Sequence, residues 1–217
     1  MKRLLLLGMV LCSGSVAAER PGSDVFDRVA AVVGKVVITQ SEVDLMAKIH
    51  LVRLGGYQKL ALSHRPEVRR KALEYLVHRT LLYEEARRLA FQKIRKEDVD
   101  RELASFRSRF PNDVAYRDFL GENDLTEEML GEILSRSLLV NRFADDSIRL
   151  NVRVGDREIE RYLAENTTNA LFAGKNDEER RELARSVLLR QRSEKAMVAL
   201  LEDLRRRFRV RVFMDLK

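Results

Sequence analysis

Apolar residues recur about every 3.6 positions from residue 66 to residue 90, and this period predicts a long amphipathic helix. Pro66 suits the first helical position, because the N–H that proline lacks would have no partner there. Glu67 follows, where the helix dipole favours a negative charge. At about 1.5 Å per residue, the helix would be roughly 36 Å long. Other helices must cover its apolar face, so we expect the rest of the chain to pack around it.

Short β-branched segments near the two ends of the chain predict strands. Residues 27–33 and 36–39 are rich in valine, and Gly34 and Lys35 between them fit the two-residue turn of a hairpin. A lone hairpin is only marginally stable and needs a third strand or a covering helix. Residues 208–214 alternate strictly and predict that third strand. We expect the two ends of the chain to meet in one sheet and to clasp the helices between them.

The segments between these strands carry a helical pattern of apolar and charged positions. The helices that it predicts span 42–53, 96–106, 113–120, 127–145, 157–165 and 178–207. Ser41, Thr126 and Asp177 are the expected N-caps. Residues 148–154 alternate with period two and are expected to be extended, and residues 166–176 are polar and offer a hinge. The predicted fold class is therefore mainly α: a helical core domain with a small antiparallel sheet formed by the N-terminal hairpin and the C-terminal strand.

The first eighteen residues have the pattern of a secretory signal peptide. Two basic residues precede an apolar run from Leu4 to Leu11, which is too short to span a bilayer, and small residues lead to an expected cleavage after Ala18. An uncleaved anchor fits the short run poorly, and a lipoprotein signal would need a small residue before Cys12. We therefore expect a periplasmic protein. Its mature chain would lack Cys12, the only cysteine, and could form no internal disulfide.

The charge balance is basic, with a formal net charge of +7. Loss of Lys2 and Arg3 leaves 39 of the 41 basic residues against 34 acidic ones, a net charge of +5. Export argues against nucleic acid as a partner, so acidic unfolded proteins are the expected counterparts, with a weak contact to an anionic membrane surface as a further possibility. A basic surface kept only for solubility explains the same charge.

No catalytic or metal-binding pattern stands out. His50, His64 and His78 lack the helical spacing at which two histidines share a metal ion. The carboxylates alternate with lysine and arginine at helical spacing, which is typical of a solvated helix face. Neither a nucleophile elbow nor a phosphate-binding loop occurs. The sequence therefore predicts no enzyme, no metal and no cofactor.

Several blocks of residues, in their order along the chain, carry a resemblance to a known family. They are DRVAAVV at 27–33, VITQSEVD at 37–44, LEYLV at 73–77, VGDREIERY at 154–162, and LR at 204–205 followed by VRV at 210–212. In this order, and after a signal peptide, they resemble the core domain of SurA-type periplasmic chaperones. The resemblance covers nearly the whole mature chain.

The chain also departs from the pattern of that family. Relatives usually carry one or two parvulin prolyl isomerase modules at the position where this chain has only residues 167–176, so isomerase activity is not carried over. The resemblance divides the chain into a signal peptide (1–18), a SurA-like helical core (19–166), a short linker that replaces the parvulin module (167–176), and a helix and strand that pack back on the core (177–217). Phe91 stands where a helix-ending glycine is expected and Arg95 where a capping Ser or Thr is expected. Residues 93–95 predict a short break between the second and third helices, and these two departures predict a join that is more continuous than in relatives.

The resemblance implies an ATP-independent chaperone that holds unfolded outer-membrane or exported proteins, called clients below, and limits their aggregation. Large apolar residues on the shorter helices are the candidates for client contact, although each also fits an ordinary core position. They are Met46, Ile49, Phe106, Phe110, Tyr116, Phe119 and Met129. The alternative function is a non-catalytic assembly or scaffold subunit that binds one dedicated folded partner, and an isomerase comes third.

Overall fold

The computed structural model describes residues 27–167 and 169–214. The elements are β1 (Val29–Val33), β2 (Val36–Thr39), α1 (Gln40–Gly55), η1 (Tyr57–Leu62), α2 (Pro66–Arg88), α3 (Lys96–Arg107), α4 (Asp113–Glu122), α5 (Glu127–Asn151), α6 (Asp156–Glu165), η2 (Ala170–Phe172), α7 (Asp177–Phe208) and β3 (Val210–Val212). The predicted signal peptide and its cysteine lie outside the described residues.

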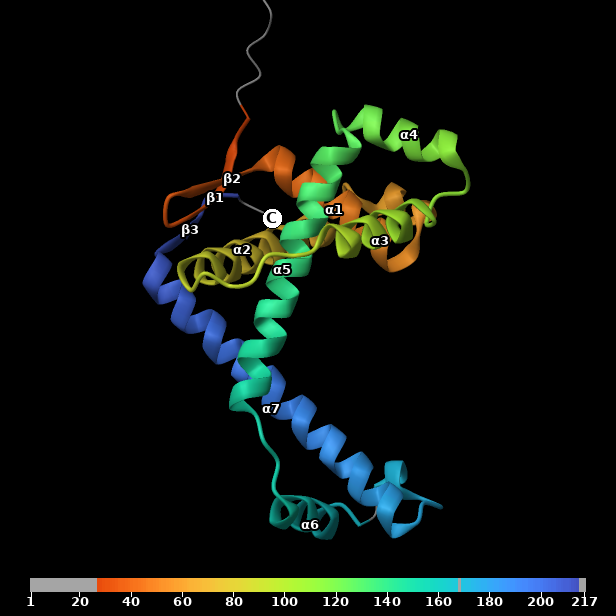
Figure 1. The fold of residues 1–217 in the computed structure, drawn as a ribbon, viewed down its shortest axis with the longest axis vertical. Coiled ribbons are helices and arrows are strands. Elements are labelled where there is room, and N and C mark those ends of the chain that lie inside the picture. Colours follow the sequence, from red (N-terminus) through yellow and green to blue (C-terminus); the bar gives the residue numbers. More distant parts are fainter. Residues whose placement is uncertain (1–26, 168, 215–217) are drawn as a thin grey trace, which may run out of the picture.

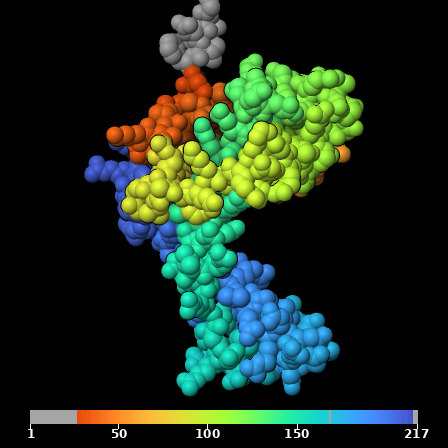
Figure 2. Space-filling model, viewed as in Figure 1, coloured from red at the N-terminus to blue at the C-terminus, as the bar shows by residue number. Residues whose placement is uncertain are grey.

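The two longest helices, α5 and α7, join a larger head to a smaller arm (Figure 1). The head contains the sheet, α1 to α4, the first part of α5 and the last part of α7. The arm contains α6, η2 and the first part of α7. In the space-filling view, the outline of the molecule is hollowed on one side between head and arm (Figure 2). The predicted class, mainly helical with a small sheet, is confirmed.

The two ends of the chain share one antiparallel sheet, as the valine-rich segments predict. Its strand order is β2-β1-β3, so the central strand β1 pairs with the C-terminal strand on one side and with its hairpin partner on the other. Ala31 lies opposite both Ile38 and Val212. Gly34 opens the hairpin turn with φ +61°, a left-handed value that glycine adopts without strain. The sheet holds the end of α7 beside the hairpin turn, where Val210 pairs with Val33 and Phe208 lies close to Gly34.

The head is built around α2, whose apolar face is covered on several sides. Leu81 of α2 is fully buried in one cluster with Val33 of β1, Val43 of α1, Phe143 of α5 and Leu204 of α7. Because residues from both ends of the sequence complete this cluster, α7 and β3 are part of the core of the head. The expectation that other elements pack around the 66–90 helix is confirmed.

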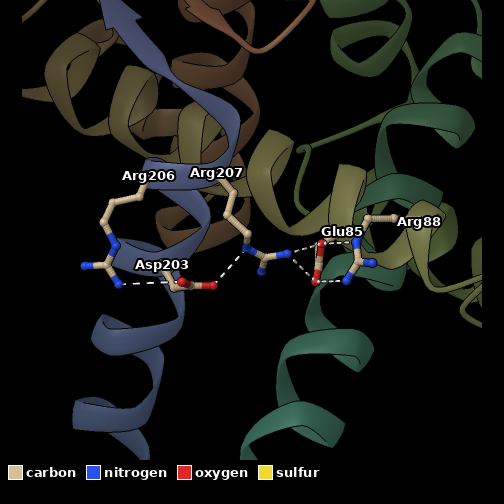
Figure 3. A network of polar contacts seen from close by, with 5 residues as sticks. All are labelled: Glu85, Arg88, Asp203, Arg206 and Arg207. Atoms are coloured by element: carbon tan, nitrogen blue, oxygen red, sulfur yellow. Dashed lines mark hydrogen bonds and ion pairs between the residues drawn. The ribbon is translucent and has the colours of Figure 1, made fainter.

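A buried carboxylate adds a polar connection between α2 and α7 (Figure 3). Glu85 of α2 is 5% exposed and accepts hydrogen bonds from Arg207 of α7 at 3.0 and 3.1 Å. Arg88, one turn along α2, donates to the same carboxylate at 2.8 Å. Arg207 is held in turn by Asp203, at 2.9 Å. Hydrogen bonds from Arg88 and Arg207 outweigh the effect of burial and lower the pKa of Glu85, so its charge is retained in the fold.

The arm has a small core of its own. Ile159 of α6, Phe172 of η2 and Ala184 of α7 are buried together. Phe172 belongs to the segment in which the sequence predicts a hinge, and its ring lies 6.3 Å from that of Tyr162. A buried aromatic side chain therefore anchors the middle of the predicted linker.

Three local predictions are wrong, and each error has a local cause. The N-cap of α1 is Thr39, whose hydroxyl accepts from the Glu42 N–H at 3.3 Å while the Glu42 carboxylate accepts from the Thr39 N–H at 2.8 Å. This reciprocal capping box satisfies two end groups at once, which Ser41 does not achieve. Asn176 caps α7 in the same way, one residue before the predicted Asp177. Thr126 caps α5 as predicted.

The segment predicted to be extended, residues 148–154, begins as helix. α5 continues to Asn151, and the Val152 N–H still donates to the Ile148 carbonyl at 2.9 Å. The alternation of apolar residues is misleading because Leu150 is 75% exposed and so does not mark a buried face. The longer helix carries the chain from the head to the arm.

The predicted break between α2 and α3 is present and is longer than residues 93–95. α2 stops at Arg88, and the Phe91 N–H returns to the Ala86 carbonyl at 2.8 Å while the Ala90 N–H bonds the Arg87 carbonyl at 3.1 Å. These two bonds define a Schellman motif. Ala90 occupies its left-handed position with φ +50°, where glycine is usual. The helix therefore ends here without a glycine, and the backbone of Ala90 is strained.

Replacing Ala90 with glycine is expected to stabilise the protein by about 1 kcal/mol, because the left-handed conformation is costly for a residue with a Cβ. Urea unfolding measures the change. Ala104→Gly, at an exposed position inside α3, is the matched control and should lose about 1 kcal/mol. A loss of stability in both variants would contradict the strain at Ala90.

Candidate functional site

Six of the seven side chains predicted to contact clients lie in the interior of the head. Met46 joins the cluster around α2, and the others form a second cluster between α1, α3, α4 and α5. The buried residues are Met46, Ile49, Phe106, Phe110, Tyr116 and Phe119, with exposed fractions of 2 to 8%. Met129 is 47% exposed on the first turn of α5. The structure thus brings most of the predicted set together as core rather than as surface.

The second cluster is what fixes α4 on the head. The ring of Phe110 lies 5.3 Å from Phe119 and 5.4 Å from Tyr116, both on α4, and Phe106 of α3 lies 5.8 Å from Phe119. The Tyr116 hydroxyl donates to Glu127 of α5 at 3.1 Å, and burial together with this carboxylate raises the pKa of Tyr116 to about 12. Contact of these side chains with a client stays a prediction, and it would require α4 to move away.

The sequence prediction missed a groove between α3 and α5. The groove has a volume of about 530 Å³. Its floor is formed by Val99 and Leu103 of α3 and by Gly131 of α5, and charged side chains form its rims. The complete lining, called the α3–α5 groove below, is Lys96, Val99, Asp100, Leu103, Glu127, Glu128, Gly131, Glu132 and Ser135.

Two features hold the groove in shape. Asp98 of α3 is 4% exposed, and Arg142 of α5 donates to it at 2.7 Å. Arg95, the residue before α3, and Arg101 of α3 bind the same carboxylate. The hydrogen bond from Arg142 is the main cause that lowers the pKa of Asp98, followed by that from Arg95. The bridge from Asp98 to Arg142 therefore sets the spacing of the two helices beside the groove.

Gly131 leaves space at the floor of the groove because it has no side chain. A Cβ at this position would lie 3.4 Å from Cδ1 of Leu103 and 3.8 Å from Cγ1 of Val99. Any larger side chain would therefore fill space that the glycine leaves open. A glycine inside an amphipathic helix was the one signal in the sequence that could have indicated this place.

The charge of the groove differs from that of the whole chain. Four carboxylates, those of Asp100, Glu127, Glu128 and Glu132, face one lysine around its rim. The basic excess of the chain therefore lies elsewhere on the surface. Apolar floor and charged rim together suit the binding of an extended polypeptide by side-chain burial, with polar groups at the edges.

The histidines form no catalytic arrangement in the described part of the chain. His78 of α2 lies 3.0 Å from Arg205 of α7, and burial followed by this guanidinium lowers its pKa. His50 packs on Tyr75, with ring centroids 5.9 Å apart. Across residues 27–167 and 169–214, no three metal-ligating side chains gather.

No helix in the described ranges combines the length and the apolarity needed to cross a bilayer.

Comparison with known proteins adds one finding. A family model described as the SurA-like N-terminal domain matches residues 4–144, which include β1, β2, α1 to α4 and most of α5. No curated protein matches the chain. The matched part contains the α3–α5 groove, the whole second cluster, and the first cluster apart from the side chains that α7 and the C-terminal segment contribute.

Proposed function

We propose, from the premise that this chain belongs to the SurA-like N-terminal domain family, that it is an ATP-independent chaperone of the periplasm. It holds unfolded outer-membrane or other exported proteins and limits their aggregation. The observation that carries the proposal is the family match over residues 4–144, because the family is of the chaperone type. The apolar floor of the α3–α5 groove, within the matched part, supports it.

The geometry of the groove fits the holding of many different chains. Its floor offers apolar surface without a deep, shaped pocket, so affinity comes from burial rather than from a specific set of hydrogen bonds. Further exposed apolar side chains lie outside it, among them Leu54 at 72% and Val198 at 55% exposure. Several weak contacts along one client give useful total affinity, while each contact releases quickly. Such binding needs no nucleotide.

An aggregation assay tests the proposal. An unfolded outer-membrane barrel protein is diluted from denaturant, and light scattering is followed with and without an equimolar amount of the mature chain. We expect the chain to slow the rise in scattering without added ATP. Scattering that is unchanged at this ratio would reject the proposal. Capture of one stable folded partner, with no effect on the unfolded barrel protein, would instead favour the assembly-subunit alternative.

The groove itself is tested by making its floor polar. The double variant Val99→Asn, Leu103→Gln is expected to weaken binding of the unfolded barrel protein about tenfold, because about 1.5 kcal/mol of apolar burial is lost. Fluorescence anisotropy of a labelled client measures the change. Leu150→Gln removes a more exposed apolar side chain, at 75%, outside the groove and is the control. Equal weakening by both would show that exposure alone, and not the groove, determines binding.

A further inference from the structure

A second cavity, far more basic than the α3–α5 groove, lies where the hairpin meets α2 and α5. It has a volume of about 240 Å³. Arg79, Tyr83 and Arg87 line it from one face of α2, Arg136 lines it from α5, and Val36 of β2 closes it. The five side chains come from three elements that the sheet and the first cluster hold together. We call this space the arginine cavity.

The arginines of the cavity are incompletely neutralised. Glu84 also lines it and binds Arg87 at 3.3 Å. In the part of the chain that the structure describes, no carboxylate forms an ion pair with Arg79 or Arg136. Nη1 of Arg79 is enclosed by the protein and has no hydrogen-bond partner among those residues. A buried guanidinium nitrogen without a partner is costly, and a bound anion that draws the Arg79 side chain toward it would relieve that cost.

Two of the guanidinium groups lie over the ring of Tyr83. Cζ of Arg87 lies 5.9 Å from the centre of this ring and Cζ of Arg136 lies 5.8 Å from it. Such cation–π contacts favour this placement of the planar groups, and both arginines remain exposed to solvent. Burial is the main cause that lowers the pKa of Arg79 and the nearby charge of Arg136 adds to it, whereas Tyr75 and the Glu42 carboxylate act in the opposite direction. The cavity therefore holds positive charges close together before any ligand arrives.

The shape and charge of the cavity select among anions. Arginine binds a carboxylate or a phosphate through paired N–H groups. A phosphate group of charge about −2 would meet the Glu84 carboxylate in the lining, which disfavours a second negative charge. Val36 and the ring of Tyr83 offer apolar contact to the carbon atoms beside a carboxylate. The volume is below the roughly 300 Å³ of a typical small-molecule site, so it suits one residue rather than a cofactor.

We propose that the arginine cavity binds a single carboxylate of a polypeptide client, either its C-terminal carboxylate or the side chain of an Asp or Glu residue. This inference rests on the proposed function and adds a polar anchor to it. One end or one acidic residue of a client is held by the arginines, while its apolar residues find the groove and other exposed apolar side chains. Such an anchor would let the chain bind acidic clients although the α3–α5 groove is itself acidic.

Three labelled peptides of one apolar sequence without acidic side chains test the cavity on the full mature chain. The first has a free C-terminal carboxylate, the second is its amide, and the third is an amide that carries one Glu residue. We expect the first, the third or both to bind about tenfold more tightly than the second, the gain of one charge-assisted pair. Whichever carboxylate shows the preference identifies the source.

Substitutions place the preference in the cavity. Arg136→Gln, at an exposed position, is expected to abolish the difference between acid and amide, and Arg136→Lys to leave part of it. Arg190→Gln removes one charge from an exposed position of α7 outside the cavity and should keep the whole difference. Equal loss in Arg136→Gln and Arg190→Gln would mean that overall charge is responsible, and the cavity assignment would then be overturned.

Two further outcomes separate this inference from the proposed function. Equal binding of acid and amide, in a chain that still slows client aggregation, overturns the arginine cavity and leaves the chaperone standing. Failure to slow aggregation rejects the chaperone itself, whatever the peptides show.

Inorganic phosphate and vesicles of phosphatidylglycerol are added as competitors. Displacement of the peptide by vesicles, without any preference for acid over amide, would assign the cavity to lipid headgroups and overturn the proposal.

Discussion

Phe106→Ala is expected to lower the free energy of unfolding by about 4 kcal/mol, the largest effect of any single substitution considered. Phe106 is 2% exposed and lies 5.5 Å from Phe110 and 5.8 Å from Phe119, ring centre to ring centre. Its loss leaves a cavity between α3 and α4 and removes two aromatic contacts at once. Urea unfolding followed by circular dichroism measures the change.

The control for this prediction is Met129→Ala. Met129 is 47% exposed, so its truncation should change stability by less than about 1 kcal/mol. If Phe106→Ala left stability nearly unchanged but weakened client binding, the aromatic cluster would be a binding surface that opens in solution. That result would restore the expectation drawn from the sequence and contradict the placement of these rings in a permanent core.

Glu85→Ala is expected to cost about 2 kcal/mol, because it removes the buried carboxylate on which Arg88 and Arg207 converge. The value is below the full cost of a broken buried pair, since the side chains of Arg88 and Arg207 are 57% and 39% exposed and regain water. Thermal or urea unfolding measures it. Glu74→Ala, an exposed position of the same helix, is the matched control and should change little. Similar losses in both variants would show that the link between α2 and α7 contributes nothing specific.

The lowered pKa of Glu85 also predicts how the free energy of unfolding depends on pH. The arginines lower the pKa of Glu85 in the folded state below its ordinary value of 4.5. Its contribution to stability is therefore complete above about pH 4.5 and is lost as the pH falls through the lower, folded-state pKa. The stability difference between the parent chain and Glu85→Ala should shrink over that acidic range. A difference that stays constant down to full protonation would contradict the depressed pKa.

Much of the fold is readable in the sequence, because it rests on local patterns. The apolar period of residues 66–90, the proline at its start and the valine-rich segments at both ends each have one main structural solution. The pairing of β3 with β1 followed from the need of a hairpin for a third strand. The errors at Ser41 and at residues 148–154 are of another kind. They arise where competing side-chain bonds or tertiary packing decide between two locally acceptable conformations.

The candidate site was harder to predict, for a physical reason. Large apolar residues such as Phe110 and Tyr116 suit a core position and a client-binding surface equally well. Only the residues that pack around them in space show which of the two they occupy. The α3–α5 groove depends on the spacing of two helices, and the arginine cavity on side chains from three elements. Neither has a sequence motif. Gly131 within α5 was the only local indication of the groove.

Hydrogen–deuterium exchange of the mature chain, with and without an unfolded outer-membrane barrel protein, tests the central claim most directly. The account predicts slower exchange in α3 and in the first half of α5 when the client is present, and no such change with the same barrel protein in its folded state. Exchange that is identical with and without the unfolded client, or protection produced only by a folded partner, would contradict it.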